Sequence, residues 1–460
     1  MSRQTDYLEL SKRGTTPRFY EVERSGARVT VTYGQVGKAG RTRTTEFDTE
    51  RKAIADTASK LNDRFYAGYV RAVRGMGPKP TPAPVLWRMS GIARTYGLFV
   101  DDRHCWVGDQ RGEVSKVRHD GTVSDRFRLP GGVRCIVADG FWVYAGCNDG
   151  RVYDLGGKVP RVAYEIAENT EIYWLDVNDG MLGVSDKTGQ VTLIDHEDES
   201  QWSRKSGGSA AWMVRCDEEG LYCGHSRGVS RFRIEDGTPV WSTALPGGVL
   251  FGWQEGAMVY AGTENGKVYQ LAKDTGRVET IYSCDASVFS CSTTPGGGRI
   301  FAADNMSSVY CFDRSGVRLW KVATGCGSAY SMQYFDGRLY LATTMGAMVC
   351  VDVSEEALQA AGAGSVPQVV DVKTADAPAV VEPTTVLESA ASAEEGVVLE
   401  CFEEGSRLRV RAVSSGYDST WNVQFPKDIR EPGTRYLVEG VRPALRGGFY
   451  RAYGDIRRLS

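Results

Sequence analysis

The sequence predicts a mainly β protein with three parts: a small α+β domain, a seven-bladed β-propeller and a small all-β domain. The first observation is the glycine content, because 54 glycines among 460 residues exceed the usual share of about 7% and indicate many tight turns. The second is a strand–turn–strand unit that recurs between residues 84 and 353. The third is the chain length, which is sufficient for two or three independent cores.

Each repeated unit contains a tight turn, between two of its strands, at which glycine is favoured. Examples are VYAGCNDGRVYDL (143–155) and VYAGTENGKVYQL (259–271). The turn residues recur every 38 to 41 positions, the length of a four-stranded propeller blade. They are Gly112, Gly150, Gly189, Gly228, Gly266, Ser307 and Gly346. Seven turns predict seven blades.

The outer strand of the last blade is missing from its expected place. In other blades a tryptophan begins this strand thirteen residues after the turn, at Trp202, Trp241 and Trp320. After Gly346 the same count reaches Gln359, in a low-complexity segment. Residues 84–89, which include VLWRM with Trp87, resemble the missing strand. We therefore expect them to pair with the last blade and close its open edge.

The blade pattern, x-AG-x-x-x-G-x-VY-x-L followed by TG and Trp, resembles the PQQ-like subclass of propellers over about 270 residues. This resemblance implies a fold and not a chemistry. Quinoprotein enzymes of that class are exported and use an adjacent Cys-Cys pair, and the sequence shows neither feature. We expect no cofactor, and we expect the propeller to bind protein partners.

Before the propeller, residues 18–24, 28–34 and 41–47 alternate apolar and polar side chains as half-buried strands do. A helix follows, which Asp48 or Thr49 can cap. Its expected buried face consists of Ala53, Ile54, Thr57, Ala58, Leu61 and Phe65. The Pro/Gly run GMGPKPTPAP then indicates a short stiff linker, so we place the domain at residues 1–76 and the linker at 77–83.

The segment YGQVGKAGRTRTTEF resembles a WGR domain, a module of DNA-damage-activated poly(ADP-ribose) polymerases and of many bacterial proteins. Val36, Gly37, Gly40 and Phe47 match its motif. Tyr33 stands where the family has Trp, and Gln35 where it has Arg. In the polymerases the Trp packs against the sugar at a DNA end and the Arg couples DNA to catalysis. Recognition of strand breaks therefore does not transfer directly, although a tyrosine can still stack on a base or sugar.

Charge is unevenly distributed along the chain. Residues 1–80 carry 16 basic and 9 acidic side chains, residues 81–395 carry 28 and 41, and residues 396–460 carry 11 and 8. A polyanion is therefore attracted to the N-terminal domain and repelled by the propeller. The nucleic-acid-binding residues that we expect are Tyr33, Gln35, Lys38, Arg41, Arg43, Arg18 and Arg28. The alternatives are a solvated basic face, an acidic protein partner, and a Tyr33 that belongs to the core.

Residues 354–395 contain no aromatic side chain and are rich in Ala, Val, Pro and Glu, which predicts a flexible linker. Residues 396–460 resume strand patterns and are expected to form a small all-β domain. A possible partner surface on it consists of Arg446, Tyr450, Arg451, Arg457 and Arg458. The alternative is that its aromatic residues form the core and its arginines are solvated.

These patterns together predict a non-catalytic adaptor. The N-terminal domain would bind nucleic acid, DNA in preference to RNA, and the propeller would bind proteins, in an assembly for DNA repair, stress response or phage defence. Four scattered histidines and eleven cysteines without a Cys-x-x-Cys unit argue against a metal site. The absence of a secretory signal pattern and of a long apolar run predicts a cytoplasmic protein that does not bind membranes. The resemblance to the WGR domain implies a bacterial protein. The alternatives are a regulatory subunit of an enzyme complex and a protein scaffold that binds no nucleic acid.

Overall fold

The computed structural model describes residues 2–12, 14–197, 200–374, 376–384, 386–388 and 396–459. The chain divides into two compact units. The first unit comprises Met1–Thr95, Ser226–Ser230 and Trp241–Thr374, and the second comprises Tyr96–His225, Arg231–Val240 and Ala375–Ser460. Within the described residues, no helix is both long and apolar enough to span a membrane.

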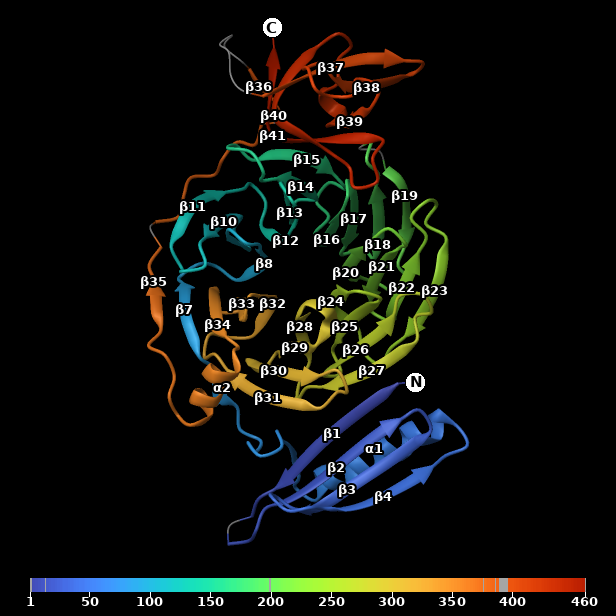
Figure 1. Cartoon of the computed structure of the whole chain (residues 1–460), viewed down its shortest axis with the longest axis vertical. Coiled ribbons are helices and arrows are strands. Elements are labelled where there is room, and N and C mark those ends of the chain that lie inside the picture. Colours follow the sequence, from blue (N-terminus) through green and yellow to red (C-terminus); the bar gives the residue numbers. More distant parts are fainter. Residues whose placement is uncertain are drawn as a thin grey trace. The chain divides into compact units, whose positions relative to one another are not determined.

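The first unit begins with an antiparallel sheet packed against one helix. Its elements are β1 (Arg3–Leu10), β2 (Arg18–Ser25), β3 (Arg28–Gln35), β4 (Arg41–Glu46), α1 (Glu50–Tyr66) and β5 (Val70–Arg71). The strands follow the order β1-β2-β3-β4, and β5 pairs with β1. Figure 1 shows α1 lying across β2 and β3, which it contacts. The sequence pattern predicted β2, β3, β4 and the helix, but not β1 or β5.

Helix α1 begins at its cap, Thr49, whose side chain accepts a hydrogen bond from the Lys52 backbone nitrogen at 3.3 Å. Ala53, Thr57 and Leu61 are buried at a spacing of four residues. The prediction that Ile54 and Ala58 share this face is wrong, because both are exposed. Only a narrow stripe of the helix contacts the sheet.

The sheet of the N-terminal domain continues directly into a propeller blade. The blade consists of β24 (Val249–Glu255), β25 (Met258–Thr263), β26 (Lys267–Ala272) and β27 (Val278–Ser283). Strand β1 runs parallel to β27, where Arg3 pairs with Thr280 and Gln4 with Ile281. A backbone ladder therefore joins the N-terminal domain to the outer strand of this blade.

A buried charged cluster accompanies this ladder. The Asp6 carboxylate is buried, and it accepts hydrogen bonds from Arg71 Nε at 3.1 Å and from Gln4 Nε2 at 2.5 Å. Burial raises the pKa of Asp6, but the charges of Arg71 and Lys267 and the bond from Gln4 outweigh it and lower the pKa to about 2. Asp6 therefore stays ionised, and it neutralises cations contributed by both the N-terminal domain and the blade.

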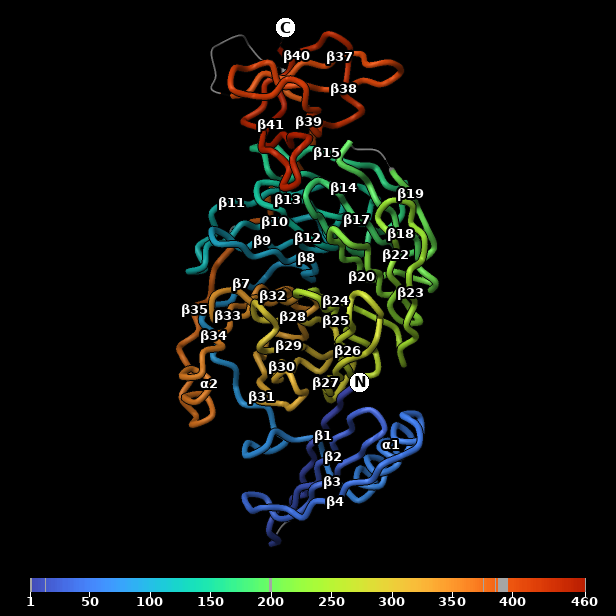
Figure 2. The backbone as a smooth tube through the Cα atoms, turned by 45° about the vertical axis from the view of Figure 1, so that its right-hand side comes forward, coloured from blue at the N-terminus to red at the C-terminus, as the bar shows by residue number. Residues whose placement is uncertain are grey.

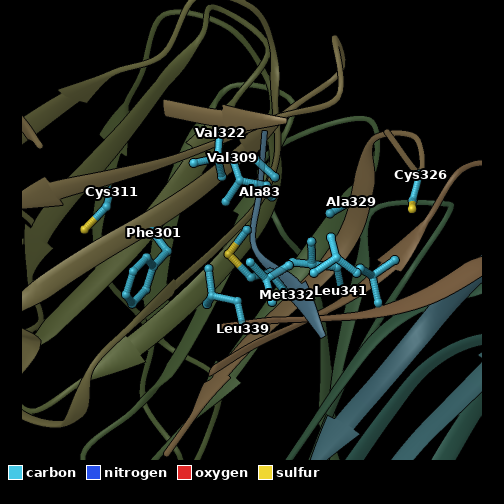
Figure 3. Close-up of a cluster of buried hydrophobic side chains, with 14 of the residues drawn as sticks. Ala83, Phe301, Val309, Cys311, Val322, Cys326, Ala329, Met332, Leu339 and Leu341 are labelled. Atoms are coloured by element: carbon cyan, nitrogen blue, oxygen red, sulfur yellow. The ribbon is translucent and has the colours of Figure 1, made fainter. Parts of the chain in front are cut away.

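Two further blades complete the first unit. The first contains β28 (Val288–Thr293), η1 (Pro295–Gly297), β29 (Arg299–Asp304), β30 (Ser308–Asp313), β31 (Arg318–Ala323) and β6 (Thr81–Pro82). The second contains β32 (Ala329–Phe335), β33 (Arg338–Thr343), β34 (Ala347–Asp352), β7 (Val85–Ser90) and β35 (Val370–Val372). Figure 2 allows the chain to be followed, in blue, from the N-terminal domain to β7. One buried core serves both blades, and Figure 3 shows Phe301 and Val309 of one blade and Met332, Leu339 and Leu341 of the other.

The predicted closure by residues 84–89 is confirmed. Strand β7 is antiparallel to β34, with Trp87 opposite Cys350, and it takes the place of the missing outer strand. The Trp87 side chain is buried, and its ring centroid lies 6.2 Å from that of Tyr340. Strand β35 then pairs in parallel with the other side of β7. The open edge of this blade is therefore covered by β7, and the far edge of β7 is covered by β35.

The segment predicted as a flexible linker, residues 354–395, contains regular structure where it is described. It begins with α2 (Glu355–Gly362), which Ser354 caps, and it also supplies β35. Residues 375, 385 and 389–395 lie outside the described part of the chain. The lack of aromatic residues led us to expect no regular structure. A capped helix and a strand that pairs with β7 form there nevertheless. The flexibility of this segment stays a prediction.

Three four-stranded sheets lie in the second unit, except for Thr95, the first residue of β8, which belongs to the first unit. They are β8 (Thr95–Val100), β9 (Cys105–Asp109), β10 (Glu113–Val117) and β11 (Val123–Arg128); β12 (Val133–Asp139), β13 (Trp142–Cys147), β14 (Arg151–Asp154) and β15 (Arg161–Glu165); and β16 (Ile172–Asn178), β17 (Met181–Asp186), β18 (Gln190–Ile194) and β19 (Ser200–Lys205). The residues of a further sheet, β20 (Ala211–Cys216), β21 (Leu221–His225), β22 (Gly228–Phe232) and β23 (Pro239–Ala244), are divided between the units. Seven such sheets confirm the predicted seven-bladed β-propeller.

All seven predicted turn residues adopt positive φ angles, from 66° at Ser307 to 145° at Gly228. Glycine suits this turn because it has no Cβ to clash in the left-handed region. Ser307 is the one exception among the seven, and its backbone nitrogen donates a hydrogen bond to Ser328 Oγ at 3.1 Å. All eleven cysteines are free and buried, as expected for small apolar side chains, and burial raises the pKa of Cys135 to about 12.

The C-terminal domain also belongs to the second unit, and it is all β as predicted. It contains β36 (Leu387–Glu388), β37 (Val397–Glu404), β38 (Arg407–Ala412), β39 (Asn422–Gln424), η2 (Lys427–Ile429), β40 (Arg435–Pro443) and β41 (Phe449–Leu459). The long strand β41 pairs with β40, β39 and β36. Leu399, Val410, Val423, Phe425 and Tyr436 form the centre of its core.

Candidate nucleic-acid interface

The register of β2, β3 and β4 places most of the predicted site residues on one face of the sheet. Across β2 and β3, Arg18 is opposite Gln35 and Tyr20 is opposite Tyr33. Residues directly opposite each other in a sheet share a face, and every second residue of a strand returns to it. Arg18, Tyr33 and Gln35 therefore lie on the face that Tyr20 occupies.

Strand β4 extends this face at the edge of the sheet. Tyr33 is opposite Arg41, and Val31 is opposite Arg43. Both arginines are exposed, because β4 is the last strand of the sheet and α1 lies against β2 and β3. We name the group Arg18, Tyr33, Gln35, Arg41 and Arg43 the Tyr33 surface.

Tyr33 is not a core residue, since 45% of its surface is exposed. Its ring centroid lies 6.4 Å from that of Tyr20, which is buried. The Arg64 guanidinium, from the last turn of α1, lies over the Tyr20 ring at 4.3 Å and over the Tyr69 ring at 5.7 Å. Tyr20 and Arg64 were not predicted to lie beside the site, although a basic residue in the last helical turn is a recognisable signal. Tyr20 packs beside Tyr33, Arg64 packs on Tyr20, and much of the Tyr33 ring stays open to solvent.

The cations of the Tyr33 surface have no counter-ion within the described residues. Arg18, Arg41 and Arg43 take part in no ion pair there, and neither does Lys38, which is exposed in the turn between β3 and β4. Arg28 differs, because it forms a salt bridge with Glu46. Arg28 also lies at the opposite end of β3 and on the other face of the sheet. Arg28 therefore lies apart from the Tyr33 surface.

Two glycines shape the turn that carries Lys38. Gly37 has a φ of +81°, in the region that favours glycine. A Cβ at Gly40 would lie 2.6 Å from the Phe19 ring and 2.8 Å from the Thr32 methyl carbon, so only glycine fits there. These contacts explain why the motif needs glycine at both positions and how β4 is held beside Tyr33.

The possible partner surface predicted on the C-terminal domain is contradicted at two of its residues. Tyr450 is buried, and its hydroxyl accepts a hydrogen bond from the Asp418 backbone nitrogen at 3.0 Å. Arg451 is also buried: Nη1 lies 2.6 Å from Asp139 Oδ2, and its guanidinium lies 3.6 Å from the centroid of the Trp142 ring. Tyr450 thus belongs to the core of the C-terminal domain, whereas Arg451 contacts β12 and β13 of the propeller.

The other three residues of that surface also have partners. Arg446 is exposed and forms an ion pair with Glu218 at 2.5 Å, and Arg458 forms one with Glu431. Arg457 is partly exposed and interacts with its own chain. Arg446 and Arg458 are therefore paired with acidic side chains of their own chain and do not form a free basic patch.

The contact through Arg451 leads to a prediction. We expect Arg451→Ala to leave Asp139 partly buried without its cation and to cost about 3 kcal/mol or more. The loss should appear as faster amide exchange along β41, measured by hydrogen–deuterium exchange. The matched control is Arg446→Ala, which removes an exposed pair and should change stability by less than about 1 kcal/mol. Equal effects of the two substitutions would contradict this account of the domain contact.

Comparison with known proteins agrees with these geometries. Residues 5–76 match the model of the WGR domain, and residues 225–421 match the model of the outer membrane protein assembly factor BamB. No curated protein matches the chain. Among solved structures, the chain resembles the WD40 β-propeller domain of Doa1, with a TM-score of 0.52 and 13% identity over 60% of this chain and 98% of that one. The computationally designed Ika8 protein has a TM-score of 0.47 and 10% identity over 59% and 99%. The chain thus combines a WGR domain at residues 5–76 with BamB-like propeller repeats at residues 225–421.

Proposed function

We propose that this protein is a non-catalytic adaptor that binds nucleic acid, DNA in preference to RNA, through the Tyr33 surface. In this proposal the propeller and the C-terminal domain bind protein partners in an assembly for DNA repair, stress response or phage defence. The observation that carries the proposal is the grouping of Arg18, Arg41 and Arg43, which have no ion-pair partner among the described residues, around one exposed aromatic ring. Nucleic-acid binding in the WGR family supports it.

The two kinds of side chain have separable roles. Arg41 and Arg43 contact phosphates, because their guanidinium groups are charged, exposed and free to make bidentate bonds. Tyr33 stacks on a base or sugar, a contact worth roughly 1–3 kcal/mol. Gln35 adds a hydrogen bond without charge, so it orients the ligand and contributes no counterion release.

The test measures the affinity of the full chain for a short DNA duplex over a range of salt concentrations. Arg41→Ala with Arg43→Ala should weaken binding to every sequence and flatten the log–log salt slope by about 2, since each duplex phosphate contact contributes roughly 0.9. Tyr33→Ala should weaken binding by roughly 1–3 kcal/mol and leave the slope nearly unchanged, because stacking releases no counterions.

Arg28→Ala is the matched control, since Arg28 lies on the same sheet but on the other face and pairs with Glu46. It should leave both affinity and slope close to those of the natural chain. The proposal is wrong if the chain does not bind at about 50 mM salt, or if Arg28→Ala flattens the slope as much as the double substitution. The first result would favour a protein scaffold that does not bind nucleic acid.

A further inference from the structure

The first strand of most blades contains a β-bulge at the same place. In the second unit the register of these strands shifts between Val133 and Cys135 in β12, and between Ile172 and Trp174 in β16. It shifts in the same way between Ala211 and Met213 in β20. The residues skipped by the ladder are Arg134, Tyr173 and Trp212. A bulge of this kind leaves one residue unpaired and redirects its side chain.

The first unit shows the same irregularity in three strands, β24, β28 and β32, where the skipped residues are Leu250, Phe289 and Tyr330. All six skipped residues are partly exposed, and each stands between two buried neighbours. Folding does not require a large side chain at a position that turns away from the packed interior. Even so, all six are large, and four of the six are aromatic.

In the second unit these side chains touch one another. Tyr173 and Trp212 stack with ring centroids 6.3 Å apart and an interplanar angle of 9°. The Arg134 guanidinium lies 5.4 Å from the Tyr173 ring centroid and 4.6 Å from that of Tyr96, which is the second residue of β8. We name Tyr96, Arg134, Tyr173 and Trp212 the aromatic row. It is a continuous, partly exposed stack built from four successive first strands.

The aromatic row has a local positive charge. Arg134 Nη2 lies 3.0 Å from Glu171 Oε2, and Lys187 Nζ lies 3.7 Å from the other oxygen of the same carboxylate. Two cations therefore share one anion. In contrast, residues 96–225 as a whole carry 14 basic and 22 acidic side chains. A ligand with a single carboxylate can pair with these cations, whereas a polyanion is repelled by the net negative charge of the surrounding residues.

We propose that the aromatic row binds a peptide segment of a partner protein that presents one aromatic side chain beside one carboxylate. The aromatic ring packs on Tyr173 and Trp212, because partly exposed aromatic clusters on rigid strands are typical anchors of protein interfaces. The carboxylate pairs with Arg134, which Glu171 and the two tyrosine rings hold in place. This site is separate from the Tyr33 surface and does not depend on nucleic-acid binding.

The test uses the full chain and the fluorescein-labelled peptide Gly-Ser-Phe-Asp-Gly-Ser, with binding followed by fluorescence anisotropy. We expect Trp212→Ala and Arg134→Gln each to weaken binding at least about tenfold, which corresponds to about 1.4 kcal/mol. Trp212→Phe keeps an aromatic ring and should retain most of the affinity, so it separates loss of the anchor from loss of the fold. The matched control is Arg151→Gln, which removes an exposed ion pair with Glu165 elsewhere in the unit and should change nothing.

Two altered probes test the stated chemistry. A peptide with Ala in place of Phe should bind at least about tenfold more weakly, and so should one with Asn in place of Asp. The proposal is overturned if the natural chain does not bind the first peptide at about 1 mM, or if Trp212→Ala binds it unchanged. It is also overturned if a ten-nucleotide single strand displaces the peptide from the Arg41→Ala, Arg43→Ala chain, because the row would then bind nucleic acid.

Discussion

Trp87→Ala should destabilise the first unit by about 3–5 kcal/mol, the usual cost of removing a buried tryptophan. Trp87 is 3% exposed and lies in β7, the strand that supplies the outer edge of the last blade. Its loss leaves a cavity beside Tyr340 and weakens a strand that pairs on both sides. Urea unfolding at neutral pH, followed by tryptophan fluorescence, measures the change.

Arg88→Ala provides the comparison, because Arg88 is the next residue of β7 but is partly exposed and pairs with Asp371 near the surface. It should cost less than about 1 kcal/mol. Deletion of residues 84–89 should have a larger effect and cause aggregation, since it uncovers the edge of β34. If the deletion variant melts like the natural chain, β7 does not close the blade in solution.

Asp6→Asn should cost about 3–5 kcal/mol at pH 7, because it leaves Arg71 and Lys267 without their buried counter-charge. The pKa of Asp6 is about 2 in the folded chain, below its ordinary value of 3.8. The folded state thus gains stability from the ionised carboxylate above about pH 4 and loses it as the pH falls toward 2. A difference of nearly two pKa units corresponds to about 2–3 kcal/mol.

The natural chain and the Asp6→Asn variant should therefore differ most at pH 5–7, and the difference should shrink by about 2–3 kcal/mol on acidification to pH 2. Denaturant unfolding at several pH values measures it. Glu23→Gln removes an exposed pair with Arg3 on the neighbouring strand and should cost less than about 1 kcal/mol. A difference between the natural chain and Asp6→Asn that stays constant from pH 7 to pH 2 would show that Asp6 does not titrate in the predicted way.

The sequence predicted the blades well because each blade repeats a local signal. A turn that needs positive φ recurs at nearly constant spacing, and Trp87 carries the signature of the strand it replaces. Strand β5 was missed because it has only two residues and pairs with the distant β1. Strand β1 was missed although it pairs along its whole length with β2. The buried residues of β1 include Gln4, Thr5, Asp6 and Glu9, whose polarity hides a core strand from a hydrophobic pattern.

Only part of the candidate site could be predicted, because strand alternation is a local signal and the packing between distant segments is not. Alternation along β3 and β4 correctly places Tyr33, Arg41 and Arg43. Arg28 was grouped with them from its charge alone, which does not show that it lies on the other face and pairs with Glu46. Arg451 and Tyr450 were assigned to a surface from composition alone. The core of the C-terminal domain buries Tyr450, and contacts with β12 and β13 bury Arg451. The bulge residues recur every 38 to 41 positions from Arg134 to Tyr330. This spacing was present in the sequence, but it was not recognised because the residue types at these positions differ from blade to blade.

The shared bulge separates the backbone of a blade from the chemistry of its exposed side. Six first strands insert the extra residue at the same register, although its identity ranges from Arg to Leu to Trp. The bulge is therefore a property of the blade backbone and does not depend on one kind of side chain. Each of these blades thus offers one partly exposed position, between two buried residues, at which the side chain can vary while its buried neighbours keep their packing.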